Sequence, residues 1–343
     1  MRKLLNTLYV TSEDVFLSLD GECIVVNYPD KSKKMVPLHT LECVVSFSNK
    51  GATPALIGKC VKAGVFMSFY SPYGKFLFNV GNEVNGNVFL RREQYRIADD
   101  KARALAIAKN FILGKLYNSK YVLHRYVRDH SLQIDVDEVR KAITSLSESM
   151  ESAEEADEMD ILRGVEGKAA VVYFSGFPCL ILQNKDVFYF KERVRRLATD
   201  PVNAMLSFSY TLLSNDCAAA LRSVGLDPYV GFMHAERPGR KSLSLDLVEE
   251  LRSVFADRFV LMLINNRVLD SNDFEKRENG EVRLKDDARQ KFLSEWQKRK
   301  REEIMHPYLH EKIKWGLVPY VQALLLARVV RGDLEAYPPF FWK

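Results

Sequence analysis

The sequence has few cysteines, and they lack the spacings by which cysteines bind metal or form a disulfide framework. The five cysteines are odd in number, widely separated and never paired as CxxC; they are Cys23, Cys43, Cys60, Cys179 and Cys217. This pattern argues against a disulfide-stapled domain and against a structural zinc site.

Long hydrophobic runs are also missing. No stretch approaches the ~20 apolar residues of a transmembrane helix. The first residues, MRKLLNTLYVTSED, carry charge at both edges without a long apolar core, unlike a signal peptide. We therefore expect a soluble protein of a reducing cytoplasm, with no membrane partner. A chain of 343 residues is long enough for two or more domains.

Positive charge is not abundant overall, but it is clustered. The formal net charge is only +5, because the acidic run 151–160 offsets several basic groups. These are the Arg91/Arg92 pair, the arginines of 193–196, the Arg237/Arg240/Lys241 group and the run 298–301. Local clusters govern the binding of a polyanion more than net charge does, so the pattern indicates a nucleic-acid partner.

The N-terminal part of the chain is rich in strand signals. Residues 1–80 contain short runs of β-branched and aromatic residues, such as CIVVNY and VFMSFY, which are typical of strands. Asp20-Gly21 predicts a hairpin turn, and Pro54–Ala63 predicts a short helix. Residues 81–90 include GNEVNGN, which is dense in glycine and asparagine and predicts a linker.

From residue 91 to residue 343 the apolar residues recur at helical spacing. The expected helices cover 91–126, 136–150, 160–174, 202–224, 243–268, 288–305 and 308–331. Because strands and helices are segregated along the chain, the predicted fold class is α+β. It consists of a small N-terminal β-rich domain over residues 1–80 and a larger all-helical C-terminal domain over residues 91–343.

The segment HAERPGRKSLSLDLVE, residues 234–249, carries the strongest chemical signal. A histidine and a basic loop precede a helix on which Asp246, Glu249 and Glu250 share a face. We expect this acidic edge to point out of the core, toward the turn of His234. A histidine that faces carboxylates across a basic loop suits a divalent-metal phosphodiester site. The alternative is a solvated helix with Ser242 as its N-cap and acids near its first turns.

Glu166 is the second candidate. On a helix its i−4, i+3 and i+7 neighbours are all apolar, so its carboxylate lies on or beside an apolar stripe. Burying an unpaired carboxylate is costly. A metal, or a basic residue such as Arg163 or Lys168, would resolve the cost. The alternative is a position at the rim of the helix.

Glu166, His234 and Glu249 together offer two carboxylates and one imidazole. This donor set suits Mg²⁺ or Mn²⁺, and the imidazole favours Mn²⁺. Such an ion would lower the pKa of a nucleophile and stabilise negative charge on the phosphate. Basic groups of the neighbouring loop would bind the same phosphate or its neighbours; they are Arg237, Arg240 and Lys241.

Seven motifs occur in the order found in one protein family. They are Arg91…Gln94-Tyr95, Gly114-Lys115-Leu-Tyr-Asn118, Leu162-Arg-Gly-Val-Glu166-Gly-Lys-Ala169, Asp200-Pro-Val-Asn203-Ala204, Gly225-Leu-Asp227-Pro228, Gly231-Phe-Met-His234 and Gly239-Arg240-Lys-Ser242-Leu-Ser-Leu-Asp246-Leu-Val-Glu249. With these motifs in register over essentially its whole length, the chain resembles the CRISPR-associated integrase, the universal endonuclease/integrase of CRISPR spacer acquisition.

The resemblance implies a prokaryotic protein with an N-terminal β domain and a helical domain that holds the metal site. Carried over residue by residue, it places the metal ligands and catalytic residues at Glu166, His234 and Glu249. Asp246 is an additional acid and Asn203 an accessory residue near the site. The last ligand is often aspartate in the family, whereas here it is Glu249. The resemblance also implies a homodimer that joins a small ferredoxin-like partner on DNA.

The predicted function is that of a metal-dependent DNA integrase and endonuclease. A prespacer 3′-hydroxyl would attack a phosphodiester of the CRISPR repeat and so insert a new spacer during antiviral defence. His234 serves as a ligand or in proton transfer, and Arg163 and Lys168 join the basic loop as expected DNA contacts. Two other functions stay open: a metal-dependent repair nuclease that uses water as the nucleophile, and a non-catalytic DNA-binding scaffold.

The C-terminal tail, Tyr337–Trp342, is aromatic and rich in proline. We expect it to pack on its own domain; docking on the partner or on an unpaired base are the alternatives.

Overall fold

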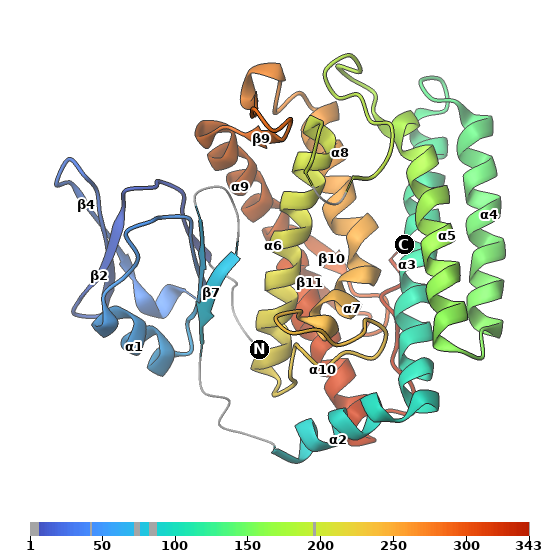
Figure 1. Ribbon diagram of the computed structural model, residues 1–343, viewed down its shortest axis with the longest axis horizontal. Helices are drawn as coiled ribbons and strands as arrows, with labels where there is room; N and C mark the ends of the chain where they lie inside the picture. The colour runs from blue at the N-terminus through green and yellow to red at the C-terminus, as the bar shows by residue number, and fades with distance from the viewer. Residues whose placement is uncertain (1–6, 42, 72–75, 82–87, 195–196, 343) are drawn as a thin grey trace. The chain divides into compact units, whose positions relative to one another are not determined.

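The computed structural model describes residues 7–41, 43–71, 76–81, 88–194 and 197–342. By its contacts the chain divides into two compact units, Met1–Asn85 with Lys285–Arg301, and Gly86–Leu284 with Glu302–Lys343. Strands come first and helices dominate afterwards, so the predicted α+β class is confirmed (Figure 1). The expected linker over 81–90 falls mostly on 82–87, outside the described residues, and α2 begins at Val88.

The first unit contains two sheets. The four-stranded sheet has the order β1-β5-β6-β7, in which the first three strands are parallel and the last is antiparallel to β6. Its strands are β1 (Thr7–Val10), β5 (Cys43–Ser46), β6 (Phe66–Tyr70) and β7 (Phe76–Val80). The antiparallel three-stranded sheet consists of β2 (Phe16–Asp20), β3 (Cys23–Asn27) and β4 (Lys33–Pro37).

The hairpin and the short helix that the sequence predicts in this unit are both present. In the hairpin, however, Asp20 ends β2 and pairs with Cys23, so the turn residues are Gly21 and Glu22 rather than Asp20-Gly21. Helix α1 spans Pro54–Ala63: the Thr53 hydroxyl accepts the Leu56 amide at its start, and proline occupies the first turn. Apolar residues of both sheets and of α1 form one buried cluster, which includes Leu17, Val44, Leu56 and Met67.

Helix α9 (Asp286–Arg301) belongs to the first unit by its contacts, although it lies late in the sequence. Within that unit the Arg289 guanidinium lies 5.7 Å from the ring centroid of Phe47. The structure therefore differs from the expectation of a single helical domain over 91–343, because periodicity reveals a helix but not the element on which it packs.

The second unit is mostly helical. Its helices are α2 (Val88–Asp99), α3 (Lys101–His130), α4 (Val136–Glu155), α5 (Met159–Gly176), α6 (Pro201–Ser223), α7 (Ser242–Leu251), α8 (Arg258–Asn265) and α10 (Val318–Arg331). Two short hairpins correct the all-helical expectation; they are β8 (Phe274–Lys276) with β9 (Val282–Leu284), and β10 (Glu303–Met305) with β11 (Lys312–Lys314). No helix among the described residues is long and apolar enough to cross a membrane.

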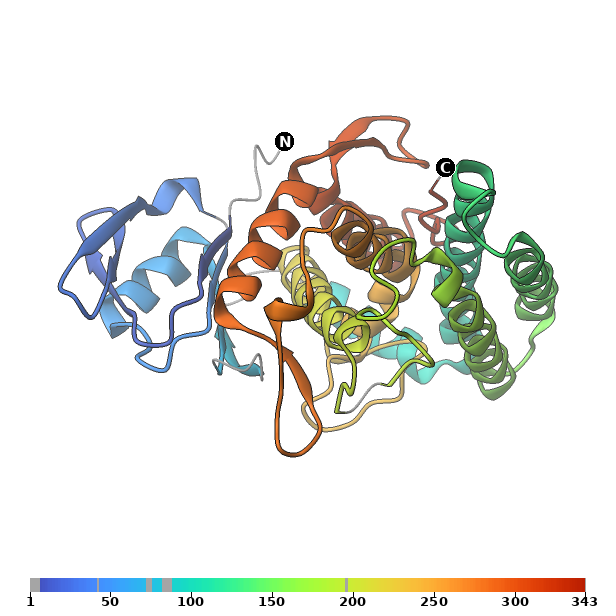
Figure 2. The same cartoon turned by 90° about the horizontal axis from the view of Figure 1, so that it is seen from above.

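Helix α3 is the centre of this unit. It packs against α4 and α5 on one side, which Figure 2 shows as neighbouring helices, and against α7 on another. A Cβ at Gly114 would lie 2.9 Å from Cβ of Glu250, so the absence of a side chain there permits the close approach of α3 to α7. Asp100 caps α3 and thereby splits the helix expected over 91–126 into two.

A π-helical turn, Arg252–Asp257, separates α7 from α8 and interrupts the helix expected over 243–268. Such turns rotate the side chains that follow them and are frequent at functional sites. Arg252 and Asp257, the two end residues of this turn, line the cavity that holds the candidate site.

Candidate active site

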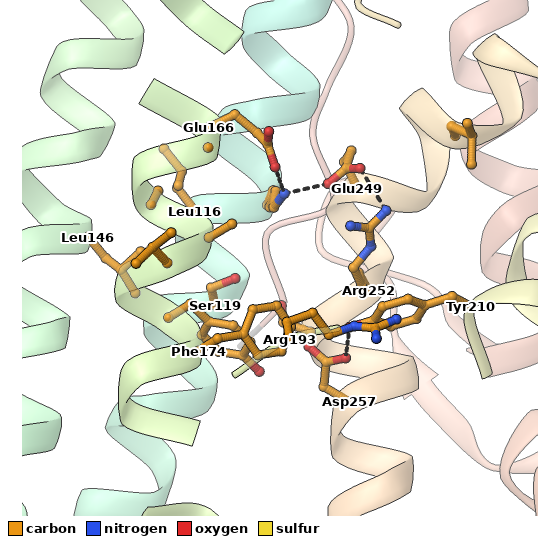
Figure 3. A pocket seen from close by; sticks show the side chains of 18 of the residues that line it. Leu116, Ser119, Leu146, Glu166, Phe174, Arg193, Tyr210, Glu249, Arg252 and Asp257 are labelled. Atoms are coloured by element: carbon orange, nitrogen blue, oxygen red, sulfur yellow. Dashed lines mark hydrogen bonds and ion pairs between the residues drawn. The ribbon is translucent and has the colours of Figure 1, made fainter. Parts of the chain in front are cut away.

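The three predicted ligands line one cavity of about 630 Å³ in the second unit. Glu166 comes from α5, His234 from the loop before α7, and Glu249 from α7. Figure 3 shows Glu166 and Glu249 directed toward the same nitrogen atom, which is Nζ of Lys115 on α3. The structure therefore brings together residues that lie far apart in the sequence.

Lys115 is the functional residue that sequence reasoning missed. Its ammonium is hydrogen-bonded to Glu166 and lies 2.6 Å from Oε2 of Glu249, and the residue is buried. Two sequence signals could have identified Lys115: the motif Gly114-Lys115-Leu-Tyr-Asn118 that contains it, and its place on the buried stripe of α3. Lys115 supplies the charge that the sequence assigned to a metal or to Arg163 or Lys168 as the partner of Glu166.

Glu249 is held between two cations. Nη2 of Arg252, three residues further along the chain, lies 2.7 Å from Oε1, while Lys115 approaches Oε2. Burial by itself would raise the pKa of Glu249, but Arg252, Lys115 and His234 outweigh it and lower the pKa to about 2. The carboxylate is therefore ionised and ready to bind a cation at neutral pH.

Asp246 fixes His234. Its carboxylate accepts backbone amides from Phe232, Met233 and His234 at 2.7, 3.1 and 3.0 Å, and Oδ1 lies 2.6 Å from Nδ1 of the imidazole. A carboxylate can only accept here, so Nδ1 carries the proton. In the neutral imidazole Nε2 then has a lone pair; it lies 3.9 Å from Oε1 of Glu249. Asp246 thus orients the His234 ring, and its own oxygens are already occupied.

The loop that carries His234 is fixed at both ends. A Cβ at Gly231 would lie 2.8 Å from Oδ2 of Asp246 and 2.9 Å from the Ser242 backbone, so a side chain there would displace the carboxylate. At the base of the loop, Gln94 of α2 donates to the carbonyls of Asp227 and Val230, both at 2.8 Å.

The acids of α7 do not point out of the core as expected. The exposed fractions of Asp246, Glu249 and Glu250 are 0, 2 and 0 %, because α7 packs against both α3 and α6. Each carboxylate has its own polar partners, which makes burial tolerable. The expected N-cap is also wrong: Ser242 is the first helical residue and donates to the carbonyl of Ala235 at 3.1 Å.

Arg163 braces the His234 loop. Its Nε donates to the carbonyl of Met233 at 3.0 Å and its Nη2 at 2.5 Å, while Nη1 pairs with Asp160 at 2.8 Å. The side chain predicted to contact DNA or Glu166 is therefore occupied in holding Met233, the residue before His234. Lys168 is exposed on α5 and stays available for DNA.

Asn203 does not reach the ligands. Its Nδ2 donates to the carbonyl of Glu192 at 2.9 Å and to Asp200 at 2.7 Å, and its Oδ1 accepts from the Val194 amide at 2.9 Å and from Arg193 at 2.8 Å. These bonds use the donors and acceptors of the amide. Asn203 braces the segment that presents Arg193 to the cavity.

The basic residues of the predicted loop lie in different surroundings. Arg240 lines the cavity with the ligands, and Arg237 is exposed. Nζ of Lys241 donates to Oδ1 of Asn215 at 3.2 Å, and burial lowers the pKa of Lys241 to about 8. Lys191 is a further basic residue of the cavity wall.

An arginine–tyrosine stack forms another part of the wall. The guanidinium carbons of Arg193 and Arg252 lie 5.1 and 4.8 Å from the ring centroid of Tyr210. The Tyr210 hydroxyl donates to Asp257 at 2.5 Å, and burial raises the pKa of Asp257 to about 6. The stack holds the Arg252 guanidinium in place and so stabilises its ion pair with Glu249.

Glu250 of α7 binds the C-terminal tail and does not face Glu166 and His234. Oε2 accepts the Phe340 amide at 2.7 Å, and Oε1 accepts from Tyr337 and Gln322. Asn118 donates to the carbonyls of Glu250 and Phe340. The expectation that the tail packs on its own domain is confirmed, and Glu249 is the residue of this pair that faces the ligands.

The donor set fits a divalent ion. No three His, Cys, Asp or Glu side chains in the described ranges are arranged to hold a metal as they stand. Instead, the Lys115 ammonium lies between Glu166 and Glu249 and is paired with both. Two carboxylates that already share one cation, with an imidazole nitrogen beside them, are suitable ligands for Mg²⁺ or Mn²⁺ once that ammonium moves.

Comparison with known proteins identifies the family to which this fold and site belong. The family model of CRISPR associated protein Cas1 matches residues 8–298. "CRISPR-associated endonuclease Cas1 2" of Rhodospirillum rubrum is 47% identical over 347 residues, and the match covers 100% of both chains. The chain belongs to the Cas1 family of CRISPR-associated proteins. This confirms the resemblance seen in the sequence and the predicted class of function, a CRISPR-associated nuclease and integrase.

Solved structures share the fold. A casposase bound to integration product superposes with a TM-score of 0.86 at 24% identity, and the match covers 99% of this chain and 95% of that one. A chain of a Cas6-RT-Cas1–Cas2 complex superposes with a TM-score of 0.84 at 19% identity, and the match covers 100% of this chain and 37% of that one.

Proposed function

We propose that this chain is a metal-dependent DNA endonuclease and integrase that inserts new spacers into a CRISPR array by transesterification. The observation that carries the proposal is that Glu166 and Glu249 share the Lys115 ammonium, while Nε2 of His234 lies 3.9 Å from Oε1 of Glu249. The cavity around them is lined by basic side chains, which suits a polyanionic substrate; they are Lys115, Lys191, Arg193, Arg240 and Arg252.

Glu166, Glu249 and Nε2 of His234 would hold Mg²⁺ or Mn²⁺, which acts as a Lewis acid for phosphodiester transfer when bound. Asp246 binds Nδ1 of His234 and so leaves Nε2 as the ring nitrogen that faces Glu249. Arg240 binds and orients phosphate at the cavity wall.

In the proposed reaction a prespacer 3′-hydroxyl attacks a phosphodiester of the CRISPR repeat. One P–O bond forms and one breaks, so the number of phosphodiester bonds is unchanged. The proton of the attacking hydroxyl ends, by way of solvent, on the leaving 3′ oxygen.

The proposal includes a homodimer and a small ferredoxin-like partner. It is supported by the family resemblance and by the occurrence of this fold in a Cas6-RT-Cas1–Cas2 complex. The casposase with the same fold was solved with an integration product, which supports DNA as the substrate.

Strand transfer from a labelled prespacer to a repeat-bearing plasmid tests the function. With the partner and Mg²⁺ or Mn²⁺ present, we expect joined products that disappear in Glu166→Ala. Cleavage without joining would indicate a repair nuclease, and DNA binding without either reaction would indicate a scaffold.

A further inference from the structure

The ammonium of Lys115 occupies the position where the two carboxylate ligands converge. It binds Glu166 on one side and lies 2.6 Å from Glu249 on the other. The side chains of Lys115, Glu166 and Glu249 are 9, 14 and 3 % exposed. Little water reaches this group, so the carboxylates depend on protein cations for their counter-charge, and Lys115 is the one that they share.

The local charge does not accommodate a divalent ion in addition to this lysine. Glu166 and Glu249 carry two negative charges, and Lys115 and Arg252 already balance them. An ion bound by both carboxylates would lie within a few ångströms of the ammonium. Two cations at such a separation repel strongly in a poorly hydrated site.

Of the two balancing cations, Lys115 is the one that can leave. Arg252 is stacked on Tyr210 and paired with Glu249, and its planar guanidinium is held by that geometry. Lys115 has a flexible four-carbon stem and borders the 630 Å³ cavity, so its ammonium has room to move.

We propose that Lys115 and the divalent ion compete for the same two carboxylates. Lys115 holds Glu166 and Glu249 together before the ion binds, and metal binding requires its ammonium to move into the cavity. This inference rests on the proposed metal-dependent function and assigns to Lys115 the role of setting the metal affinity. Lys115 is a positioning residue for the two ligands.

Calorimetric titration of the full chain with Mn²⁺, without DNA, tests the competition. Lys115→Met retains the length of the side chain and removes its charge. We expect Mn²⁺ to bind Lys115→Met about tenfold or more tightly than the unmodified protein, since one like charge is removed. The melting temperature without metal should fall, because Glu166 and Glu249 are deprived of a counter-charge, and saturating Mn²⁺ should raise it more than in the unmodified protein.

Two variants control the experiment. Lys120→Met lies on the same helix, where Nζ of Lys120 donates to Ser147 at 3.1 Å, and it should leave Mn²⁺ affinity unchanged. Lys115→Arg retains the charge, so it should bind Mn²⁺ no more tightly than the unmodified protein. Lys115→Arg also keeps the test informative if Lys115→Met fails to fold, since tighter binding by Lys115→Arg would overturn the proposal.

The outcomes separate this inference from the function on which it rests. Equal or weaker Mn²⁺ binding by folded Lys115→Met, with binding abolished in Glu166→Gln, would overturn the competition and leave the metal site intact. Failure of Mn²⁺ to bind both the unmodified protein and Lys115→Met would overturn the metal site itself.

Discussion

Oδ1 of Asp246 lies 2.6 Å from Nδ1 of His234 and also accepts the His234 backbone amide at 3.0 Å. One carboxylate thus fixes both the ring and the main chain of the same residue. A carboxylate behind an imidazole sets its tautomer and makes the opposite nitrogen a better metal ligand.

Asp246→Asn should weaken Mn²⁺ binding by about 10- to 100-fold, the usual effect of removing a partner behind a ligand histidine. The amide offers one acceptor oxygen in place of two and does not favour the Nδ1–H tautomer. Calorimetry on the folded variant measures the change. Asp227→Asn, in the same loop but with its carboxylate on Tyr95 and the Tyr229 amide, serves as the control. Unchanged affinity in Asp246→Asn would contradict the orienting role.

Replacing any one ligand should abolish strand transfer. Glu166→Ala, His234→Ala and Glu249→Ala each remove one donor to a single ion, whereas DNA affinity depends mainly on basic residues and should be largely retained. Plasmid integration and filter binding measure the two properties separately. Glu249→Asp should keep partial activity, because the family often has aspartate there. Near-normal integration by His234→Ala in saturating Mn²⁺ would exclude His234 as a ligand.

The sequence predicted that Glu166, His234 and Glu249 belong to one site because each lies in a contiguous motif on a recognisable helix or loop, and all three line one cavity. It did not predict Lys115 as their partner, because the contact joins α3 to α5 and α7 and depends on tertiary packing. The burial of the α7 acids was missed for a related reason. Hydrophobic periodicity marks the apolar face of a helix, but a second packed neighbour can also bury its polar face when hydrogen-bond partners are supplied.

Arg163 and Asn203 show the same limit of sequence-based prediction for individual side chains. The residue types and their nearness to the motif were correct signals, yet Arg163 is bound to the carbonyl of Met233 and Asn203 to Glu192, Val194 and Arg193. Such side-chain to backbone contacts depend on where loops pass, and sequence spacing does not encode that.

Glu250 should make the stability of the protein depend on pH. Burial raises the pKa of Glu250 from 4.5 to about 7, so the folded protein binds this proton more tightly than the unfolded chain does. The associated stabilisation is fully present below about pH 4.5 and is lost as the pH rises to about 7, on the order of 3 kcal/mol in total. Glu250→Gln should remove this part of the pH dependence.

Denaturant unfolding from pH 4.5 to 7.5 measures the effect as a difference between the two proteins. The comparison is needed because burial lowers the pKa of His306 to about 4, which makes stability rise with pH over part of the same window. His306 is present in both proteins, so its contribution largely cancels. Parallel curves for the unmodified protein and Glu250→Gln would show that folding does not raise the pKa of Glu250.

The chain should be a homodimer in solution, with the first unit supplying much of the interface. A small β unit buries a limited core by itself, so association would stabilise it. Light scattering on the purified protein measures the mass. A monomer at micromolar concentration, unchanged when the partner protein is added, would count against both the dimer and the integration complex.

The basic loop should contribute salt-dependent DNA affinity, and its residues should contribute unequally. Removing one side chain that neutralises a duplex phosphate should reduce the slope of log affinity against log salt by about 0.9. Arg240→Ala is expected to show this reduction because Arg240 lines the cavity, and Arg237→Ala because Arg237 is exposed. Lys241→Ala should change the slope less, since its ammonium is bound to Asn215. Fluorescence anisotropy over a salt series measures the slopes, and an unchanged slope in the triple alanine variant would remove the loop from the DNA path.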